Sequence, residues 1–302
     1  MSRNHKPTLI VITGPTGSGK SQLAVDLAEK LGCEIISADS RQIFLDIPIG
    51  TAAPTAKQLA AVPHHFVGTL SLEQSYSAAR FEADVLDLLP KLWNKNDYAI
   101  MCGGSMMYID AVTKGIDDLP DISPEVRDAA MRIYTEGGIN KARDVLKTLD
   151  PEYYKIVDIN NHKRIVHAIE ITMQAGVPYS SLRTGKVAER HFNIVKFAID
   201  YPREELFDRI NRRVEEMIAS GFEREAEKVF DLRHLNSLNT VGFKELFAVL
   251  EGKMDRNTAI ARIAKNTRVF AKKQLTWMKK DSDIHYLSPD SAINQILSIL
   301  NK

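Results

Sequence analysis

Short apolar runs alternate with helix-like segments along the first third of the chain. Residues 8–13 (TLIVIT) are almost continuously apolar or β-branched, which is typical of a strand buried on both faces. Residues 21–31 (SQLAVDLAEKL) then place apolar side chains at helical spacing. Further strands are predicted at residues 34–38 (EIISA), 98–101 (YAIM) and 192–199 (FNIVKFAI). Strands that alternate with helices predict an α/β fold with a parallel sheet.

A glycine-rich loop joins the first predicted strand to the first predicted helix. Its sequence at residues 14–21 is GPTGSGKS. The glycines allow backbone N–H groups to point inward, and the helix N-terminus adds partial positive charge. Lys20 would bring a full charge to the terminal phosphates, and the Ser21 hydroxyl would hold Mg²⁺. The candidate phosphate-binding residues are Gly14, Pro15, Thr16, Gly17, Ser18, Gly19, Lys20 and Ser21.

The loop and the strands together predict the domain organisation. We expect a P-loop NTPase/kinase-like parallel sheet core, built from residues 1–114 plus 195–302, with basic helices near the C-terminus. Residues 115–194 read as mostly helical and are predicted to form an inserted domain. A chain of 302 residues is long enough for about two domains.

Charge changes this picture locally rather than globally. The net charge is +1, so any surface that binds nucleic acid must be a local patch. Residues 256–280 contain eight Lys or Arg and no Asp or Glu, and on a helical wheel the basic residues gather on one side while Phe270 falls among the apolar residues opposite. The two cysteines form no CxxC pair, and no signal peptide or membrane segment is apparent, so we expect a cytoplasmic protein without membrane contact.

Two further strand ends carry candidate chemistry. Residues 39–42 (DSRQ) follow the second predicted strand, and residues 103–108 (GGSMMY) follow the third. In doubly wound sheets, ligands bind outside the carboxyl ends of the strands. Asp39 could be a general base, a magnesium ligand or the cap of the next segment. The two glycines before Ser105 indicate either close approach of a ligand or an ordinary turn.

Together these motifs resemble the tRNA dimethylallyltransferases, along nearly the whole chain. Several further segments follow in the order typical of that family: IFLDIPIGTAAPT (43–55), PHHF (63–66), YSAARF (76–81), KRIVHAIE (163–170), VGFKEL (241–246) and FAKKQLTW (270–277). The glycine loop alone is generic, whereas this ordered set is specific. The chain departs from the usual family residues at Gly68, Ser105, Met106, Lys163 and His167, which leaves the detail of the tRNA contacts open.

The resemblance implies transfer of a dimethylallyl group from dimethylallyl diphosphate to N6 of adenine 37 in tRNA. The loop would then hold a leaving diphosphate together with Mg²⁺, and not ATP. Asp39 would take a proton from the amine, and Ser105 stands where the family usually has a threonine that contacts the acceptor nucleotide. Arg213 matches a family arginine near the diphosphate, although a shift by one residue to Arg212 and a merely solvated helix face are also open.

The expected partners are dimethylallyl diphosphate and the anticodon stem-loop of tRNA, bound by a monomer. The residues that the resemblance places near tRNA are Asp39, Ser40, Arg41, Gln42, Ser105, Arg127, Lys163, Arg164, Ile165, Val166 and His167. The basic face of residues 256–280 adds Arg268, Lys272 and Lys273, for which a merely solvated cationic face is the alternative.

Other functions compete with this one. A P-loop nucleotide kinase would consume ATP and carry arginines on a short lid. A related enzyme would prenylate free AMP or ATP. A P-loop RNA-binding protein without chemistry would leave Asp39 and the second glycine turn unexplained.

Overall fold

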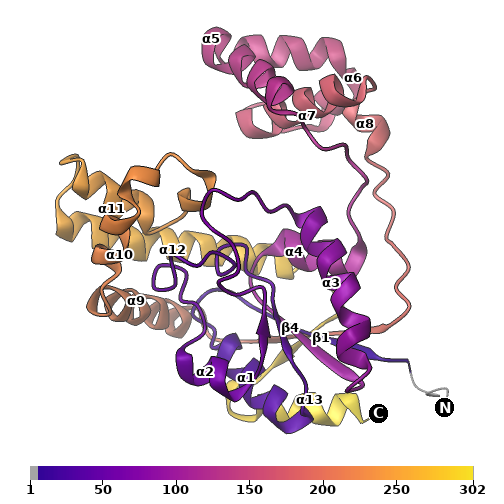
Figure 1. The fold of residues 1–302 in the computed structure, drawn as a ribbon, viewed down its shortest axis with the longest axis vertical. Coiled ribbons are helices and arrows are strands. Elements are labelled where there is room, and N and C mark those ends of the chain that lie inside the picture. Colours follow the sequence, from indigo (N-terminus) through magenta and orange to yellow (C-terminus); the bar gives the residue numbers. More distant parts are fainter. Residues whose placement is uncertain (1–5, 302) are drawn as a thin grey trace. The chain divides into compact units, whose positions relative to one another are not determined.

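The computed structural model of the protein describes residues 6–301, and the chain divides into two compact units. The first unit comprises Met1–Thr113 and Glu189–Lys302, and the second comprises Lys114–Ala188 (Figure 1). The predicted domain boundaries at residues 114/115 and 194/195 lie near this division, and the first strand after the second unit begins at Asn193.

A six-stranded parallel sheet forms the centre of the first unit. Its strands lie in the order β3-β2-β4-β1-β5-β6. Their bounds are β1 Thr8–Thr13, β2 Ile35–Ser37, β3 His64–His65, β4 Tyr98–Cys102, β5 Asn193–Ile199 and β6 Ile284–Leu287. In the register of the central strands, Ile10 lies opposite Ile100 of β4 and Val195 of β5. This arrangement confirms the predicted α/β fold with a parallel sheet.

Helices of the first unit cover both faces of this sheet and extend beyond it. They are α1 Lys20–Leu31, α2 Ala56–Ala61, α3 Ala78–Trp93, α4 Met106–Lys114, α9 Arg203–Ala219, α10 Phe222–Lys228, α11 Phe243–Leu250, α12 Arg256–Met278 and α13 Ala292–Leu300. Short 3-10 turns lie at Phe230–Leu232, Asn236–Leu238 and Pro289–Ser291.

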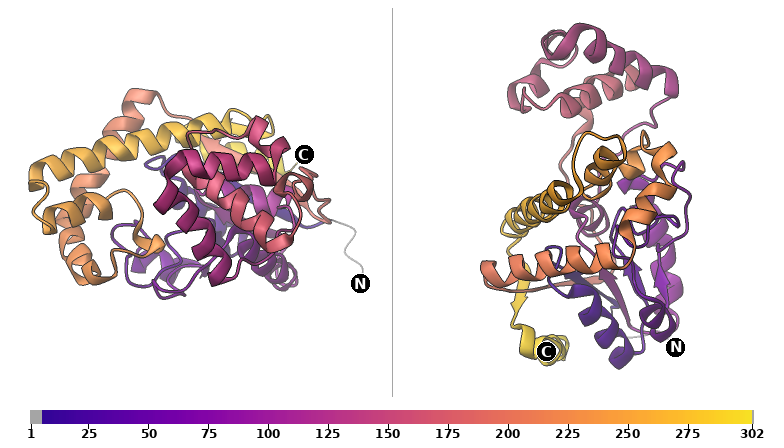
Figure 2. Two further views of the ribbon diagram at one scale, coloured as in Figure 1. Left: turned by 90° about the horizontal axis from the view of Figure 1, so that it is seen from above. Right: turned by 90° about the vertical axis from the view of Figure 1, so that its left-hand side faces the viewer.

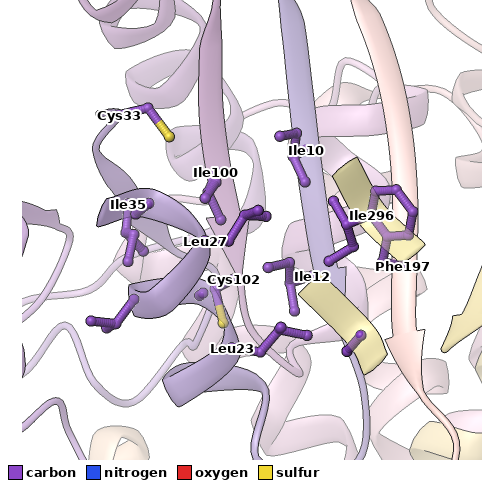
Figure 3. Close-up of a cluster of buried hydrophobic side chains, with 14 of the residues drawn as sticks. Ile10, Ile12, Leu23, Leu27, Cys33, Ile35, Ile100, Cys102, Phe197 and Ile296 are labelled. Atoms are coloured by element: carbon purple, nitrogen blue, oxygen red, sulfur yellow. The ribbon is translucent and has the colours of Figure 1, made fainter. Parts of the chain in front are cut away.

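The continuous apolar run of β1 is explained by cores on both sides of it. Side chains of a strand alternate between the two faces. Ile10 and Ile12 therefore join Leu27 of α1 and Ile296 of α13 on one face (Figure 3), while Leu9 and Val11 pack with α3 and α4 on the other. Burying each such side chain contributes about 1.5–3 kcal/mol.

A third core lies beside the sheet, between its loops and the later helices. Side chains of α9, α10, α11 and α12 pack there with those of residues 43–72, and Figure 2 shows the long helices α9 and α12 from two further sides. Gly50 belongs to this packing, because a Cβ at that position would lie only 2.3 Å from the Phe222 ring and 2.5 Å from the Phe243 ring.

The second unit is helical. Its helices are α5 Pro124–Leu149, α6 Pro151–Ile156, α7 His162–Ala175 and α8 Tyr179–Leu182. They enclose a core of their own that includes Leu146, Ile165 and Ile169. The fully buried Asp150 accepts hydrogen bonds from Tyr153 N at 2.9 Å and Ser180 N at 2.6 Å, which fixes the start of α6 against α8. In residues 6–301, no helix has both the length and the apolar character of a membrane span.

Candidate active site

Three loops that follow neighbouring strands line one side of a cavity of about 490 Å³, and residues from 210–274 line the other side. Strands β2, β4 and β1 are adjacent and parallel, so their carboxyl ends lie at one edge of the sheet. The phosphate loop, Asp39 and Ser105 all line this cavity. The structure thus brings together the three features that the sequence placed at strand ends.

The phosphate loop has the backbone shape that its glycines permit. Gly17 and Gly19 have φ values of 84° and 79°, which favour glycine. Gly19 precedes α1, and no side chain caps that helix N-terminus, so its first N–H groups and partial positive charge suit an anion.

Lys20 is the buried cation of the loop. Its Nζ donates a 3.4 Å hydrogen bond to Pro15 O. Burial lowers the pKa of the ammonium group, and the positive charge of nearby Arg213 lowers it further. A bound anion in the cavity would stabilise the charged form of Lys20 and would so offset the cost of its burial.

Asp39 caps the turn that follows β2. Its Oδ1 accepts hydrogen bonds from Arg41 N at 2.9 Å and Gln42 N at 3.4 Å, which is the capping role considered from the sequence. No hydrogen bond engages Oδ2 within residues 6–301. The carboxylate lines the cavity, so one oxygen holds the turn and the other is available for a proton or a ligand.

The remaining residues of DSRQ also line the cavity. Gln42 accepts a 3.0 Å hydrogen bond from Ser37 Oγ and donates one of 3.0 Å to Ala52 O, so it fastens the following loop to β2. Burial lowers the pKa of the Arg41 guanidinium, while the charge of Asp39 acts in the opposite direction.

Ser105 connects the loops after β2 and β4. Its Oγ accepts a hydrogen bond from Ser40 N at 2.8 Å and lies 3.2 Å from Ser40 Oγ. A Cβ at Gly103 would lie 2.1 Å from Ala38 O. The first glycine of the GGS turn is therefore required by close approach of the neighbouring protein backbone, whereas the sequence had left open a ligand or an ordinary turn.

Helix α9 supplies Arg213 to the cavity wall. Arg213 lines the cavity, and burial lowers its pKa while Asp39 acts against that shift. Arg212 is exposed and does not line the cavity. Of the two arginines that the sequence left open, only Arg213 therefore has a position at the cavity. On the same helix, Arg209 Nε donates a 2.8 Å hydrogen bond to Gly17 O and supports the phosphate loop from outside the cavity lining.

The basic residues predicted on α12 have different surroundings. Lys273 is exposed and lines the cavity. Arg268 Nη1 donates a short hydrogen bond to Asn211 Oδ1, and Lys272 Nζ lies 5.6 Å from the centre of the Phe207 ring. Phe270 was expected on the apolar side, but it is 40% exposed and lines the cavity, because that side of α12 faces the cavity there instead of a closed core.

In the second unit, the predicted tRNA contacts lie on α5 and α7. The Lys163 and Arg164 side chains are exposed. Arg127 Nε and His167 Nδ1 lie 4.0 Å and 2.9 Å from the carboxylate of Glu170. Two further residues that were predicted near tRNA, 165 and 166, have side chains that are buried in the core of this unit and not available at its surface. They are Ile165 and Val166, at 0% and 4% exposure.

Sequence reasoning missed several polar residues of the cavity, among them one amide and one ammonium group on later helices. Gln274 and Lys244 both line it. They lie within the segments FAKKQLTW and VGFKEL, so the signal was present, but a polar residue inside a basic or amphipathic helix is usually solvated.

The cavity also suits a metal ion that arrives with phosphate groups. Within the described residues, no group of three or more His, Cys, Asp or Glu side chains is placed to hold a metal. Magnesium bound by phosphates needs only one or two protein ligands, and the Ser21 hydroxyl and the Asp39 carboxylate both line the cavity.

The chain is similar in sequence and in structure to known proteins over nearly its whole length. The family model described as IPP transferase matches residues 42–281. tRNA dimethylallyltransferase 1 of Phocaeicola vulgatus is 52% identical over 283 residues, which cover 94% of each chain. The crystal structure of a tRNA isopentenylpyrophosphate transferase from Bacillus halodurans matches with a TM-score of 0.71 and 30% identity, over 98% of this chain and 96% of that one. A eukaryotic dimethylallyltransferase acting on tRNA shares the fold, with a TM-score of 0.83 and 24% identity over 98% of this chain and 79% of that one.

Proposed function

We propose a mechanism from the premise that this chain belongs to the IPP transferase family, as a tRNA dimethylallyltransferase. The enzyme prenylates tRNA: a dimethylallyl group passes from dimethylallyl diphosphate to N6 of adenine 37, and diphosphate is released. The observation that carries the mechanism is the cavity in which Lys20, Asp39 and Ser105 meet.

The phosphate loop and its cations stabilise the leaving group. Breaking the allylic C–O bond puts negative charge on the departing diphosphate. The backbone amides at the start of α1 bind the diphosphate, and Lys20 and Arg213 bring positive charge to it from the cavity wall. The Ser21 hydroxyl, which lines the cavity, would hold Mg²⁺, and the ion would supply further positive charge to the leaving group.

Asp39 and Ser105 act on the acceptor. The adenine amine is a poor nucleophile, so removal of its proton assists formation of the N6–carbon bond. Asp39 Oδ2 takes that proton, while Oδ1 keeps the turn in place. Ser105 lines the cavity, and its Oγ is held in place by a hydrogen bond from Ser40 N. Its hydroxyl therefore orients the acceptor nucleotide beside Asp39. Adenine must leave the stack of the anticodon loop to reach this position, at a cost of a few kcal/mol.

Basic residues of both units bind the anticodon stem-loop in this proposal. Lys273 lies at the cavity, and Lys163 and Arg164 are exposed on α7. Phosphate contacts of this kind supply affinity that depends strongly on salt. We also propose that the enzyme is a cytoplasmic monomer; tRNA and the reducing conditions that suit its free Cys33 and Cys102 are found in the cytoplasm.

Incubation of the purified protein with Mg²⁺, dimethylallyl diphosphate and an anticodon stem-loop bearing A36-A37-A38 tests the reaction. Mass spectrometry should show the gain of one C5H8 unit on adenine 37. A parallel reaction with AMP as acceptor and a third with ATP as the only diphosphate compound separate the alternatives. Product on AMP alone, or ATP hydrolysis without prenylated RNA, would contradict the proposal.

A further inference from the structure

Gln274 joins the phosphate loop to the loop between β4 and α4 through one buried amide; this loop, residues 103–105, is called the acceptor loop because it carries Ser105. The side chain extends from α12 and is 3% exposed. Its Oε1 accepts a hydrogen bond from Thr16 N at 2.9 Å, and its Nε2 donates one to Gly104 O at 2.9 Å. Thr16 belongs to the loop that holds diphosphate in the proposed reaction, and Gly104 directly precedes Ser105. The amide therefore uses both of its functional groups to connect the two halves of the site.

The acceptor loop is shaped around this amide. A Cβ at Gly104 would lie 2.3 Å from Gln274 Nε2, closer than side-chain carbons approach other atoms. The φ of Gly104 is not among the positive values, so the glycine serves to admit the amide and not to permit an unusual backbone. Buried hydrogen bonds of this kind are costly to break, because they leave two backbone groups without a partner.

We propose that Gln274 is a positioning residue, which fixes the separation between the departing diphosphate and the adenine that attacks. This inference rests on the proposed reaction. Displacement requires the allylic carbon and N6 to lie about 3–3.5 Å apart, and a misplacement of about 1 Å can cost roughly 10²-fold in rate. Lys273 precedes Gln274 on α12 and lines the cavity, so the helix that is proposed to bind RNA also sets the geometry of the donor loop.

Gln274→Met is the first test, because methionine is unbranched and similar in length but cannot form either hydrogen bond. In single-turnover reactions with saturating donor and stem-loop, we expect the transfer rate to fall about 10²-fold. The dissociation constant of the stem-loop should stay close to that of the wild type, whereas the midpoint of thermal unfolding should fall, because two buried backbone groups lose their partner. A residue with a purely structural role would lower the unfolding midpoint in the same way, but would leave the single-turnover rate unchanged at temperatures well below that midpoint.

Gly104→Ala provides a second variant, which displaces the amide without altering it. It should reduce the transfer rate as Gln274→Met does. In a Gln274→Ala background, where no amide remains to be displaced, Gly104→Ala should cost several-fold less, so the double-mutant cycle is non-additive. Rates within about threefold of wild type for both single variants, or additive effects, would overturn the positioning role. A wild-type enzyme that makes no prenylated RNA would overturn the proposed reaction itself.

Discussion

In the proposed mechanism, the carboxylate of Asp39 combines a structural and a chemical role. Oδ1 accepts the Arg41 and Gln42 N–H groups, which an uncharged amide oxygen can do equally well. Proton abstraction requires a carboxylate. The two roles can therefore be separated by the choice of substitution.

Asp39→Asn should keep the turn and lose the base. We expect single-turnover transfer to slow by roughly 10²–10⁴-fold, with stem-loop affinity and the unfolding midpoint close to wild type. Asp39→Ala, the matched variant, should slow transfer to a similar extent and also lower stability by about 0.5–2 kcal/mol through loss of the cap. Normal transfer by Asp39→Asn would assign the residue to the turn alone.

Lys20 carries a charge that the protein without ligand accommodates poorly. Burial holds its pKa below the ordinary value of 10.5. At pH values between the lowered pKa of the folded protein and the ordinary pKa of the unfolded chain, the unfolded chain binds more protons, so stability rises with pH in that window. Below the window both states are protonated, and the buried charge lowers the stability of the fold.

Lys20→Met should therefore raise the denaturant midpoint near neutral pH and remove the rise of stability in the alkaline window. It should also weaken diphosphate binding by at least about tenfold, because a charge-assisted hydrogen bond is lost. Urea titration across pH and calorimetric titration with diphosphate measure the two effects. A lower midpoint than wild type would show that the ammonium group stabilises the folded state.

At the scale of elements, the hydrophobic pattern of the sequence predicted those strands and helices that are buried on several sides. Strand β1 was predicted at its observed bounds because both faces are covered, and α1 followed from its apolar spacing. Strands β3 and β6 were missed, since β3 has only two residues and β6 pairs only with β5.

The residues of the site were less accessible to this reasoning. Motifs located the phosphate loop, Asp39 and Ser105, because chemistry fixes their spacing near strand ends. Gln274 acts through contacts with Thr16 and Gly104, which are 258 and 170 residues distant in sequence. No local pattern encodes such a contact. The burial of Ile165 and Val166 likewise depends on how α7 packs within its own unit.

Helix α12 should bind RNA through the end that reaches the cavity. Lys272→Glu combined with Lys273→Glu is expected to weaken stem-loop binding and to reduce the slope of log affinity against log salt by about 1–2. Filter binding at several salt concentrations measures both quantities. The control is Lys253→Glu, whose ammonium group pairs with Glu251 at 2.6 Å outside α12. An equal effect of the control would indicate a general charge effect.

At the scale of the whole molecule, the chain leaves and rejoins the core at one place. Ala188 N donates a 2.6 Å hydrogen bond to Lys114 O, so the two ends of the second unit are neighbours. Arg190 donates hydrogen bonds to Ala111 O and Val112 O at 2.8 Å and 2.9 Å. These bonds hold the returning segment on α4, and all three residues belong to the first unit.

Replacement of residues 114–188 by a short Gly-Ser linker should therefore leave a folded core. We expect diphosphate affinity within about threefold of wild type and stem-loop affinity at least about tenfold weaker, because several phosphate contacts are lost. Circular dichroism, calorimetry and filter binding test the three statements. Lys163→Glu with Arg164→Glu in the full chain is the matched variant, and unchanged RNA binding in both proteins would remove the second unit from tRNA recognition.

The paired backbone of Lys114 and Ala188 also bears on how such enzymes diversify. A segment whose ends meet can lengthen, shrink or be exchanged between genes without shifting the register of any strand, because to the sheet it is no more than a loop. In the proposed function the second unit supplies part of the RNA contacts, so changes within residues 114–188 can alter RNA recognition without disturbing the cavity, whose lining lies entirely in the first unit.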